Sequence, residues 1–399
     1  MILQEKRNKL AKYKMKATKM KEKLQQENSN LIQDKNKKHL AFYIGSLHKG
    51  GAERVFVNLS EYFLQEGYRV TMVTQYQKEE EYELPAGVNR VISDITPEET
   101  GNSRIGNFVK RFRKLRNIWK TEQPDLVLSC IGKNNFMTVA TTFGLPARPV
   151  VSVVGEAREE YPGRMMRTLA NLLFPHAAGI ILQTERSRYF FGKRVQQKAV
   201  ILPNSLNPAF IRPRYEGERE KRIVAVGRMD ANKNHEMMIR AFARITERYP
   251  EYTLTIYGDG ELRPFLEQLV QQLGLEGKVF LPGVVQDVAK QIERASLFLI
   301  TSYSEGVSNA LIEALATGLA VIATDVPSGG TVELMTDGEN GLIIPPGEER
   351  ALVAAMEKLL GNPEYAKQLG TCAAKIQERL APERVNRLWQ AYFEKIMEK

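Results

Sequence analysis

The stretch 297-LFLITSYSEGVSNALIEALATGLAVIAT-324 decides the fold. It begins with an apolar run of strand length and ends with a second one, and residues 310–317 between them are rich in helix formers. Ser308 or Asn309 is a suitable N-cap, and Gly318 suits the end of a helix. The order strand, loop, helix, strand is typical of a doubly wound parallel sheet.

The loop at residues 304–309 is the first candidate site. Ligands of such sheets bind at the carboxyl ends of the strands, and a helix N-terminus offers free N–H groups to an anion. Gly306 allows close approach of the backbone. Glu305 and Glu313 are either solvated or part of a binding site; Glu313 borders the apolar face of its helix, where a carboxylate usually has a partner.

Composition indicates a globular protein with a basic extension. The net charge is +10, but twelve Lys or Arg and four Asp or Glu lie in residues 1–38, so the remainder is nearly balanced. Nucleic-acid binding by the folded part is therefore not expected. Cys130 and Cys372 form no disulfide or metal pattern, and the chain has no apolar run of membrane-spanning length. We expect a cytoplasmic protein without a bound metal.

The chain divides into five parts. Residues 1–38 predict a lysine-rich helical extension, either solvated or in contact with a membrane or partner. Strands and helices alternate in 39–205 and again in 222–382, so we predict two Rossmann-like domains that face each other across a cleft. Residues 206–221 read as the linker, and 383–399 as a C-terminal helix that packs toward the first domain.

Two further motifs follow strands. Gly50 and Gly51 open a helix without the spacing of a dinucleotide-binding loop, so they form either a phosphate or acceptor loop or a plain tight turn. Arg228 and Lys233 follow the first strand of the second domain. A planar guanidinium and a point charge together suit a diphosphate, although either residue alone would be an ordinary surface cation.

Together these motifs resemble the retaining glycosyltransferases of family 4, which have the GT-B fold. The resemblance rests on GGAERV, on VGR followed by Lys233, on EGVSNALIEA and on GLAVIATDVPSGGTVEL, and it covers residues 39–399. It implies transfer of a hexosyl or N-acetylhexosaminyl group from a nucleotide diphosphate sugar, with UDP expected, to a saccharide acceptor. Retention at the anomeric carbon, without a metal or other cofactor, is implied as well.

The resemblance also assigns roles. The donor diphosphate is expected between Arg228, Lys233 and the helix N-terminus, with Glu305 on the donor sugar and Glu313 on the ribose. The base is expected near Val284. The implied donor site consists of these five residues together with Gly306, Val307, Ser308 and Asn309.

The first domain departs from the family pattern. Many members carry a histidine after the strand that here ends at residue 155, where this chain has Glu156 and Arg158. The sequence is similar to a bacterial branch that acts on lipid-linked oligosaccharides in cell-surface polysaccharide synthesis. Glu156 is accordingly a candidate catalytic residue beside Glu305, Arg228 and Lys233, or else a strand-end surface residue.

A second cationic segment lies at residues 104–120. Its apolar side chains share one helical face and predict packing against the sheet, while its many cations favour an anionic membrane surface. With residues 1–38, this predicts a peripheral protein on the inner face of the cell membrane. Two other functions remain open, a non-catalytic nucleotide-sugar or lipid-surface binding module and a GT-B nucleotide-sugar epimerase; intact Arg228, Lys233, Glu305 and Glu313 favour the transferase.

Overall fold

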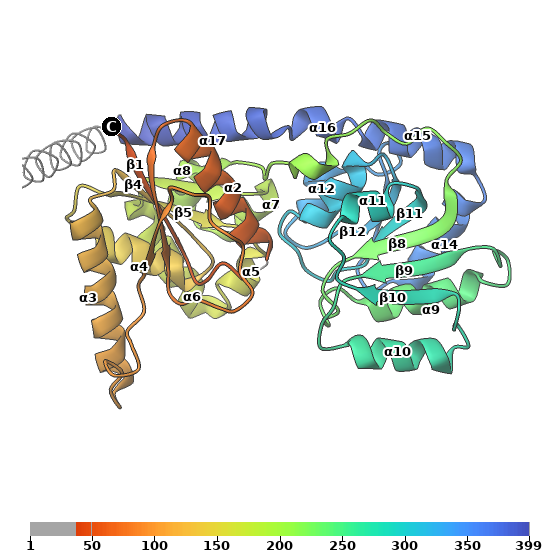
Figure 1. Ribbon diagram of the computed structural model, residues 1–399, viewed down its shortest axis with the longest axis horizontal. Coiled ribbons are helices and arrows are strands. Elements are labelled where there is room, and N and C mark those ends of the chain that lie inside the picture. Colours follow the sequence, from red (N-terminus) through yellow and green to blue (C-terminus); the bar gives the residue numbers. More distant parts are fainter. Residues whose placement is uncertain (1–36, 49, 399) are drawn as a thin grey trace, which may run out of the picture.

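The structure is a computed structural model that describes residues 37–48 and 50–398. The predicted helix in the basic extension lies outside the described residues. Two parallel sheets form two domains side by side (Figure 1), and the carboxyl ends of their strands point toward the opposite domain. The predicted class, two Rossmann-like α/β domains, is confirmed.

The first sheet has seven strands in the order β3-β2-β1-β4-β5-β6-β7. Its strands are β1 His39–Ile44, β2 Arg69–Thr74, β3 Asn89–Ile92, β4 Leu126–Cys130, β5 Arg148–Val153, β6 Gly179–Leu182 and β7 Ala199–Ile201. The helices are α2 Gly51–Gln65, α3 Arg104–Glu122, α4 Lys133–Thr142, α5 Ala157–Glu160, α6 Gly163–Leu173, α7 Glu185–Phe190 and α8 Lys193–Lys198, with the 3₁₀ turn η1 Phe174–His176. Edge strand β3 escaped prediction because it is short, polar and half-exposed.

The second sheet has six strands in the order β10-β9-β8-β11-β12-β13. These are β8 Glu220–Val226, β9 Thr253–Tyr257, β10 Val279–Gly283, β11 Ala295–Ile300, β12 Ala320–Thr324 and β13 Leu342–Ile344. The helices are α9 His235–Ile245, α10 Arg263–Gln272, α11 Val288–Ile292, α12 Asn309–Ala316, α13 Gly330–Leu334, α14 Glu349–Leu360, α15 Pro363–Ala373, α16 Ile376–Arg379 and α17 Pro382–Met397, and the turn η2 Pro208–Phe210 lies between the domains.

Each sheet is covered on both faces, as the pleat requires. In β1, Leu40 and Phe42 belong to the core that includes α2, while Ala41 and Tyr43 belong to the core under α3. Successive side chains of a strand point to opposite faces, so a strand buried on both sides is apolar throughout. This explains why continuous apolar runs located the strands of both sheets.

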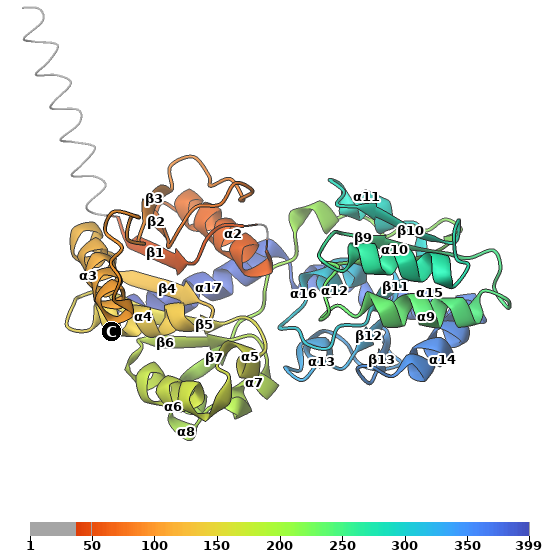
Figure 2. The same cartoon turned by 90° about the horizontal axis from the view of Figure 1, so that it is seen from below.

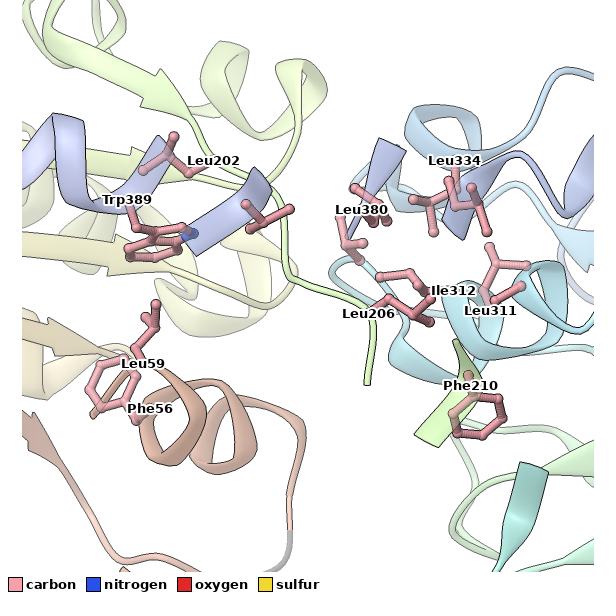
Figure 3. Packing of buried hydrophobic residues seen from close by; sticks show 14 of the residues in the cluster. Phe56, Leu59, Leu202, Leu206, Phe210, Leu311, Ile312, Leu334, Leu380 and Trp389 are labelled. Atoms are coloured by element: carbon pink, nitrogen blue, oxygen red, sulfur yellow. The ribbon is translucent and has the colours of Figure 1, made fainter. Parts of the chain in front are cut away.

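The C-terminal helix joins the two domains. After α15 and α16, α17 returns along the first domain (Figure 1), where Phe393 stacks on Phe63 with ring centroids 5.3 Å apart. The Trp389 indole N–H donates to the Pro203 carbonyl at 3.1 Å. Figure 3 shows one buried cluster that runs from α2 past Trp389 and Leu206 to α12 in the second domain. The linker and α17 therefore hold the domains together through apolar packing.

Strand β8 begins at Glu220, so the last two residues of the predicted linker belong to the second sheet. The Glu220 N–H donates to the Arg294 carbonyl at 2.9 Å, and Glu220 lies opposite Ala295 of β11. This boundary was not predictable from the sequence, because the first residues of β8 are charged and exposed and only their backbone pairing assigns them to the sheet.

Helix α3 is only partly a sheet-packing helix. Leu115 and Trp119 are buried, whereas Ile105 and Phe108 are exposed and the start of the helix projects beyond the domain (Figure 1). Several of its cations already have partners within the domain: Lys110 with the Glu99 carbonyl, Arg111 and Lys114 with Asp94, and Arg116 with the Thr141 and Phe143 carbonyls. These contacts tie part of the predicted cationic face to the domain, and Arg111 and Lys114 form ion pairs with Asp94 and Glu99. None of the described helices combines the length and apolar character needed to cross a bilayer.

Candidate functional site between the two domains

The loop that follows β11 is fixed by hydrogen bonds to the loop that follows β8. The Asn232 carbonyl accepts from the Tyr303 N–H at 2.8 Å, its side-chain oxygen accepts from the Ser304 N–H at 2.9 Å, and its amide donates to the Ser304 carbonyl at 2.7 Å. The Thr324 hydroxyl donates to the Ser302 carbonyl at 2.6 Å. These bonds hold Glu305 at the carboxyl end of the sheet, in a defined position relative to residues 228–233.

Lys233 and Glu305 form an ion pair, and the Ser302 hydroxyl donates to the same carboxylate at 2.8 Å. Both charged side chains are mostly buried. Arg228, by contrast, exposes 80% of its side chain, with a 3.2 Å contact to Asp230. The structure thus brings two of the predicted site residues, Lys233 and Glu305, into contact and leaves the Arg228 guanidinium accessible.

Helix α12 begins at Asn309, with Ser308 as its N-cap. The first intrahelical bond runs from the Ile312 N–H to the Ser308 carbonyl, so the preceding helical amides, from Asn309 to Leu311, have no partner within the helix. The Ser308 hydroxyl makes no capping bond. This end of α12 therefore offers unpaired N–H groups, and its predicted role in binding an anion stays a prediction.

The predicted role of the Val307 amide needs correction. Its N–H donates to the Gln183 side-chain oxygen at 3.2 Å, across the domain boundary. This amide is engaged with the first domain and is not free for a phosphate in this arrangement. Anion binding by backbone N–H groups consequently rests on the amides from Asn309 onward.

Glu313 is buried and faces the first domain. Its carboxylate pairs with Arg54 of α2, with 2.7 Å between Arg54 Nη2 and Glu313 Oε1. Burial raises the pKa of the Glu313 carboxyl, and the Arg54 charge opposes that rise. The sequence indicated that Glu313 needs a partner, and the structure supplies one from the opposite domain.

Helix α2 presents its N-terminus to that of α12. Gly50 is its N-cap and Gly51 its first residue, as predicted for a helix start. A Cβ added to Gly51 would lie 3.1 Å from the Asn309 side-chain amide. Burial raises the pKa of Glu53 in the same turn, and the charges of His48 and Arg228 are among those that oppose the rise. Two helix N-termini and the exposed Arg228 therefore meet in one region.

The domains are also in contact on the other side of this region. A Cβ on Gly306 would lie 2.0 Å from the Val154 carbonyl oxygen. The Thr184 hydroxyl donates to the Ser328 carbonyl at 2.5 Å, and Arg186 pairs with Asp325 at 2.7 Å. The structure is therefore a closed arrangement in which residues 305–307 lie against the end of β5.

Glu156 and Val284 lie at the margins. Glu156 follows β5 and caps α5, accepting from the Arg158 N–H at 3.2 Å. Its other oxygen is buried without a hydrogen-bond partner among the described residues. Val284 follows β10 and is 80% exposed, so an accessible surface is present where the base was predicted.

Three residues of this region escaped the sequence analysis: Arg54, Gln183 and Asn232. Arg54 stands within the quoted GGAERV motif, but only the tertiary structure pairs it with Glu313. Gln183 follows a strand and carried no distinguishing signal. Asn232 lies next to Lys233 in an Asn-rich loop, and such side chains commonly bond to nearby backbone.

Two family models match adjacent parts of the chain. The family described as "Glycosyltransferase Family 4" matches residues 49–210, and the one described as "Glycosyl transferases group 1" matches residues 209–376. The two matches meet at the linker and together span both domains. The first covers Gly50 and Gly51, and the second covers the residues from Arg228 to Glu313.

Two similar proteins come from Campylobacter jejuni. One is the GalNAc-alpha-(1->4)-GalNAc-alpha-(1->3)-diNAcBac-PP-undecaprenol alpha-1,4-N-acetyl-D-galactosaminyltransferase, 27% identical over 83% of this chain and 91% of its own length. The other is N-acetylgalactosamine-N,N'-diacetylbacillosaminyl-diphospho-undecaprenol 4-alpha-N-acetylgalactosaminyltransferase, 28% identical over 82% and 92%. This chain therefore spans nearly the whole of both enzymes.

Solved structures agree in fold. Anabaena HepE in complex with UDP superposes with a TM-score of 0.76 at 17% identity, covering 90% of this chain and 100% of that one. A sucrose-phosphate synthase from Thermosynechococcus elongatus gives 0.76 at 19% identity, covering 91% and 100%. With the family matches on both domains and the shared architecture, the chain belongs to glycosyltransferase family 4 and has the GT-B fold.

Proposed function

We propose that the protein transfers a hexosyl or N-acetylhexosaminyl group from a UDP-sugar to a lipid-linked saccharide, with retention and without a metal. The observation that carries this proposal is the meeting of the α2 and α12 N-termini beside Lys233 and Glu305. Amides and cations suit a diphosphate, and carboxylates suit sugar hydroxyls. Family membership favours a transferase over a binding module or an epimerase.

The donor diphosphate would lie against the Asn309–Leu311 amides, with Lys233 and Arg228 on its other side. Arg228 is free to turn toward it, because most of its side chain is exposed. Glu313 would accept hydrogen bonds from the ribose hydroxyls while its carboxylate stays paired with Arg54. The base would lie at Val284, and Glu305 would hold hydroxyls of the donor sugar.

The reaction would proceed on one face of the sugar. The bond between the anomeric carbon and the diphosphate oxygen breaks, and the acceptor oxygen bonds to that carbon from the same side. The leaving diphosphate takes the acceptor hydroxyl proton. Lys233, Arg228 and the amides at the start of α12 would stabilise the developing negative charge, which a metal ion otherwise does.

The names of related proteins support the choice of substrates. HepE has been solved with UDP-glucose, and the pneumococcal O-GlcNAc transferase GtfA with UDP and GlcNAc. The two Campylobacter enzymes are named for transfer to undecaprenyl-diphosphate-linked sugars. A UDP-sugar donor and a diphosphate-lipid acceptor are therefore the first pair to test.

Glu313→Ala and Arg228→Ala are each expected to weaken binding of UDP and UDP-sugars. Each change removes a charge-assisted contact worth about 1.5–3 kcal/mol. Titration calorimetry with UDP measures the loss, and Arg350→Ala on α14 is a control for removal of an exposed arginine. Unchanged UDP affinity in both variants would contradict the placement of the donor.

We further propose reversible attachment to an anionic membrane surface. The +8 charge of residues 1–38 supports it, since each basic residue near such a surface contributes about 1 kcal/mol. The exposed Ile105 and Phe108 on α3 offer an apolar contact on the same domain. Because two cations of α3 already form ion pairs within the domain, the extension would supply most of the electrostatic attraction.

Deletion of residues 1–37 is expected to abolish flotation with anionic liposomes at low salt while UDP affinity stays unchanged. Salt should weaken binding of the full chain, because exposed charges are screened. Neutral liposomes are the control. Full-length protein that remains in solution with anionic vesicles would show that the extension has no role in membrane attachment.

A further inference from the structure

A cationic cavity lies beside the proposed donor site. It has a volume of about 550 Å³ and is formed by α5, α6 and α7 of the first domain with Pro327 and Ser328 of the second. Four arginines and one glutamate supply its charged lining: Arg158, Arg164, Arg167, Arg186 and Glu156. The proposed donor contacts assign no role to it.

The cavity adjoins the loop that carries Glu305. The Ser328 hydroxyl donates a hydrogen bond to the Gly306 carbonyl oxygen at 3.4 Å. On the opposite wall, Glu156 lies two residues after Val154, whose carbonyl touches the position of a Gly306 Cβ. The cavity therefore borders Gly306, the residue that follows Glu305 in the loop.

Most of the positive charge in the cavity is not neutralised. Arg186 pairs with Asp325, and Arg167 lies over the Phe190 ring at 4.9 Å, which leaves its charge uncompensated. The side chains of Arg158 and Arg164 make no ion pair or hydrogen bond with the residues that the structure describes. Clustered guanidinium groups with open donors favour phosphate or carboxylate.

Glu156 gives the cavity a second, different function. It is only 8% exposed, and its Oε2 atom is buried without a hydrogen-bond partner among the described residues. An unpartnered buried carboxylate oxygen is costly, so it marks a position for a donor group from a ligand. A sugar hydroxyl supplies such a donor, and because it is uncharged the surrounding arginines do not repel it.

We propose that this cavity is the acceptor subsite and that it selects an acceptor with an anionic group close to the glycosylated sugar. Glu156 accepts a hydrogen bond from an acceptor hydroxyl, while Arg158 and Arg164 bind a phosphate, diphosphate or carboxylate. This inference rests on the proposed glycosyl transfer. It adds the chemical class of acceptor and assigns Glu156 to positioning of the acceptor sugar.

The test compares four acceptors that carry the same sugar: a neutral glycoside, a soluble sugar phosphate, a uronic acid and an undecaprenyl-diphosphate-linked sugar. We expect Arg158→Gln with Arg164→Gln to raise the acceptor KM by about a hundredfold for the anionic acceptors and little for the neutral one. Glu156→Gln should raise KM for all four. Arg194→Gln on α8 is the matched control.

The comparison of anionic acceptors identifies the source of the charge. If the double variant raises KM only for the lipid-linked acceptor, the cavity binds a membrane-borne diphosphate. If KM rises equally for the soluble sugar phosphate, the cavity binds the phosphate group itself. An equal rise in KM for neutral and anionic acceptors, or an unchanged KM for all of them, would overturn the inference.

A separate binding measurement distinguishes failure of this inference from failure of the proposed function. Calorimetry with the soluble sugar phosphate in the presence of UDP reports on the cavity even if no acceptor is glycosylated. If the wild type binds the soluble sugar phosphate and the double variant does not, the subsite is supported. Binding of equal strength in both, or none in either, would contradict it, while unchanged UDP affinity in the double variant shows that the donor site is intact.

Discussion

Lys233→Ala is expected to lower kcat by about 10²–10³, the loss typical when one preorganised donor to a developing negative charge is removed. Lys233 is mostly buried, paired with Glu305, and lies in a loop that Asn232 fixes to the loop after β11. Its removal would also leave Glu305 as an uncompensated carboxylate beside the donor diphosphate. Repulsion would then add to the lost attraction.

Steady-state kinetics with the preferred UDP-sugar would measure this loss. Lys367→Ala, which removes an exposed lysine of α15, should leave kcat unchanged and serves as the control. Thermal unfolding of Lys367→Ala should stay close to that of the wild type, whereas Lys233→Ala should unfold at a lower temperature, because it leaves the mostly buried Glu305 carboxylate without its partner. A Lys233→Ala enzyme with nearly full kcat would show that Lys233 is a structural partner of Glu305 only.

Gly306→Ala is expected to reduce activity by at least about a hundredfold without unfolding either domain. The added Cβ would lie 2.0 Å from the Val154 carbonyl oxygen, which belongs to the backbone of the opposite domain. Neither side of that contact is a flexible side chain, so the domains must separate. A displacement of about 1 Å can cost a hundredfold when reacting groups must be aligned.

Small-angle X-ray scattering should show a larger radius of gyration for Gly306→Ala than for the wild type. Gly101→Ala is a matched control, because its Cβ would meet only ordinary contacts, the nearest at 3.7 Å. A larger radius of gyration together with full activity would show that the closed arrangement is not the active one, and unchanged scattering would show that the contact at Gly306 does not force the domains apart.

The sequence predicted the strands of the second sheet well because parallel strands buried on both faces are continuously apolar. The segment from Leu297 to Thr324 contains a strand, a helix and a strand, as expected. Strand β3 and the first residues of β8 lack that signature and are defined only by backbone pairing. Local composition therefore located buried elements and missed exposed ones.

The site was only partly predictable for a different reason. Lys233 and Glu305 lie in the loops that follow β8 and β11, which are neighbouring strands of one sheet, so the topology alone brings them together. The partners Arg54 and Gln183 come from the other domain, and their contacts depend on how the domains dock. The linker and α17 set how the domains dock through apolar packing. Their apolar residues do not indicate which side chains of the two domains meet in the cleft.

The central claim is glycosyl transfer from a nucleotide diphosphate sugar at the loop between β11 and α12, without a metal. The most direct measurement follows labelled sugar from a panel of UDP-sugars into an undecaprenyl-diphosphate-linked acceptor in EDTA, for the wild type and Glu305→Gln. We predict labelled product from the wild type at the rate seen without EDTA, and a severe loss in the variant, which still binds UDP. Bound UDP-sugar with no labelled acceptor, or transfer that EDTA abolishes and Mg²⁺ restores, would contradict the account.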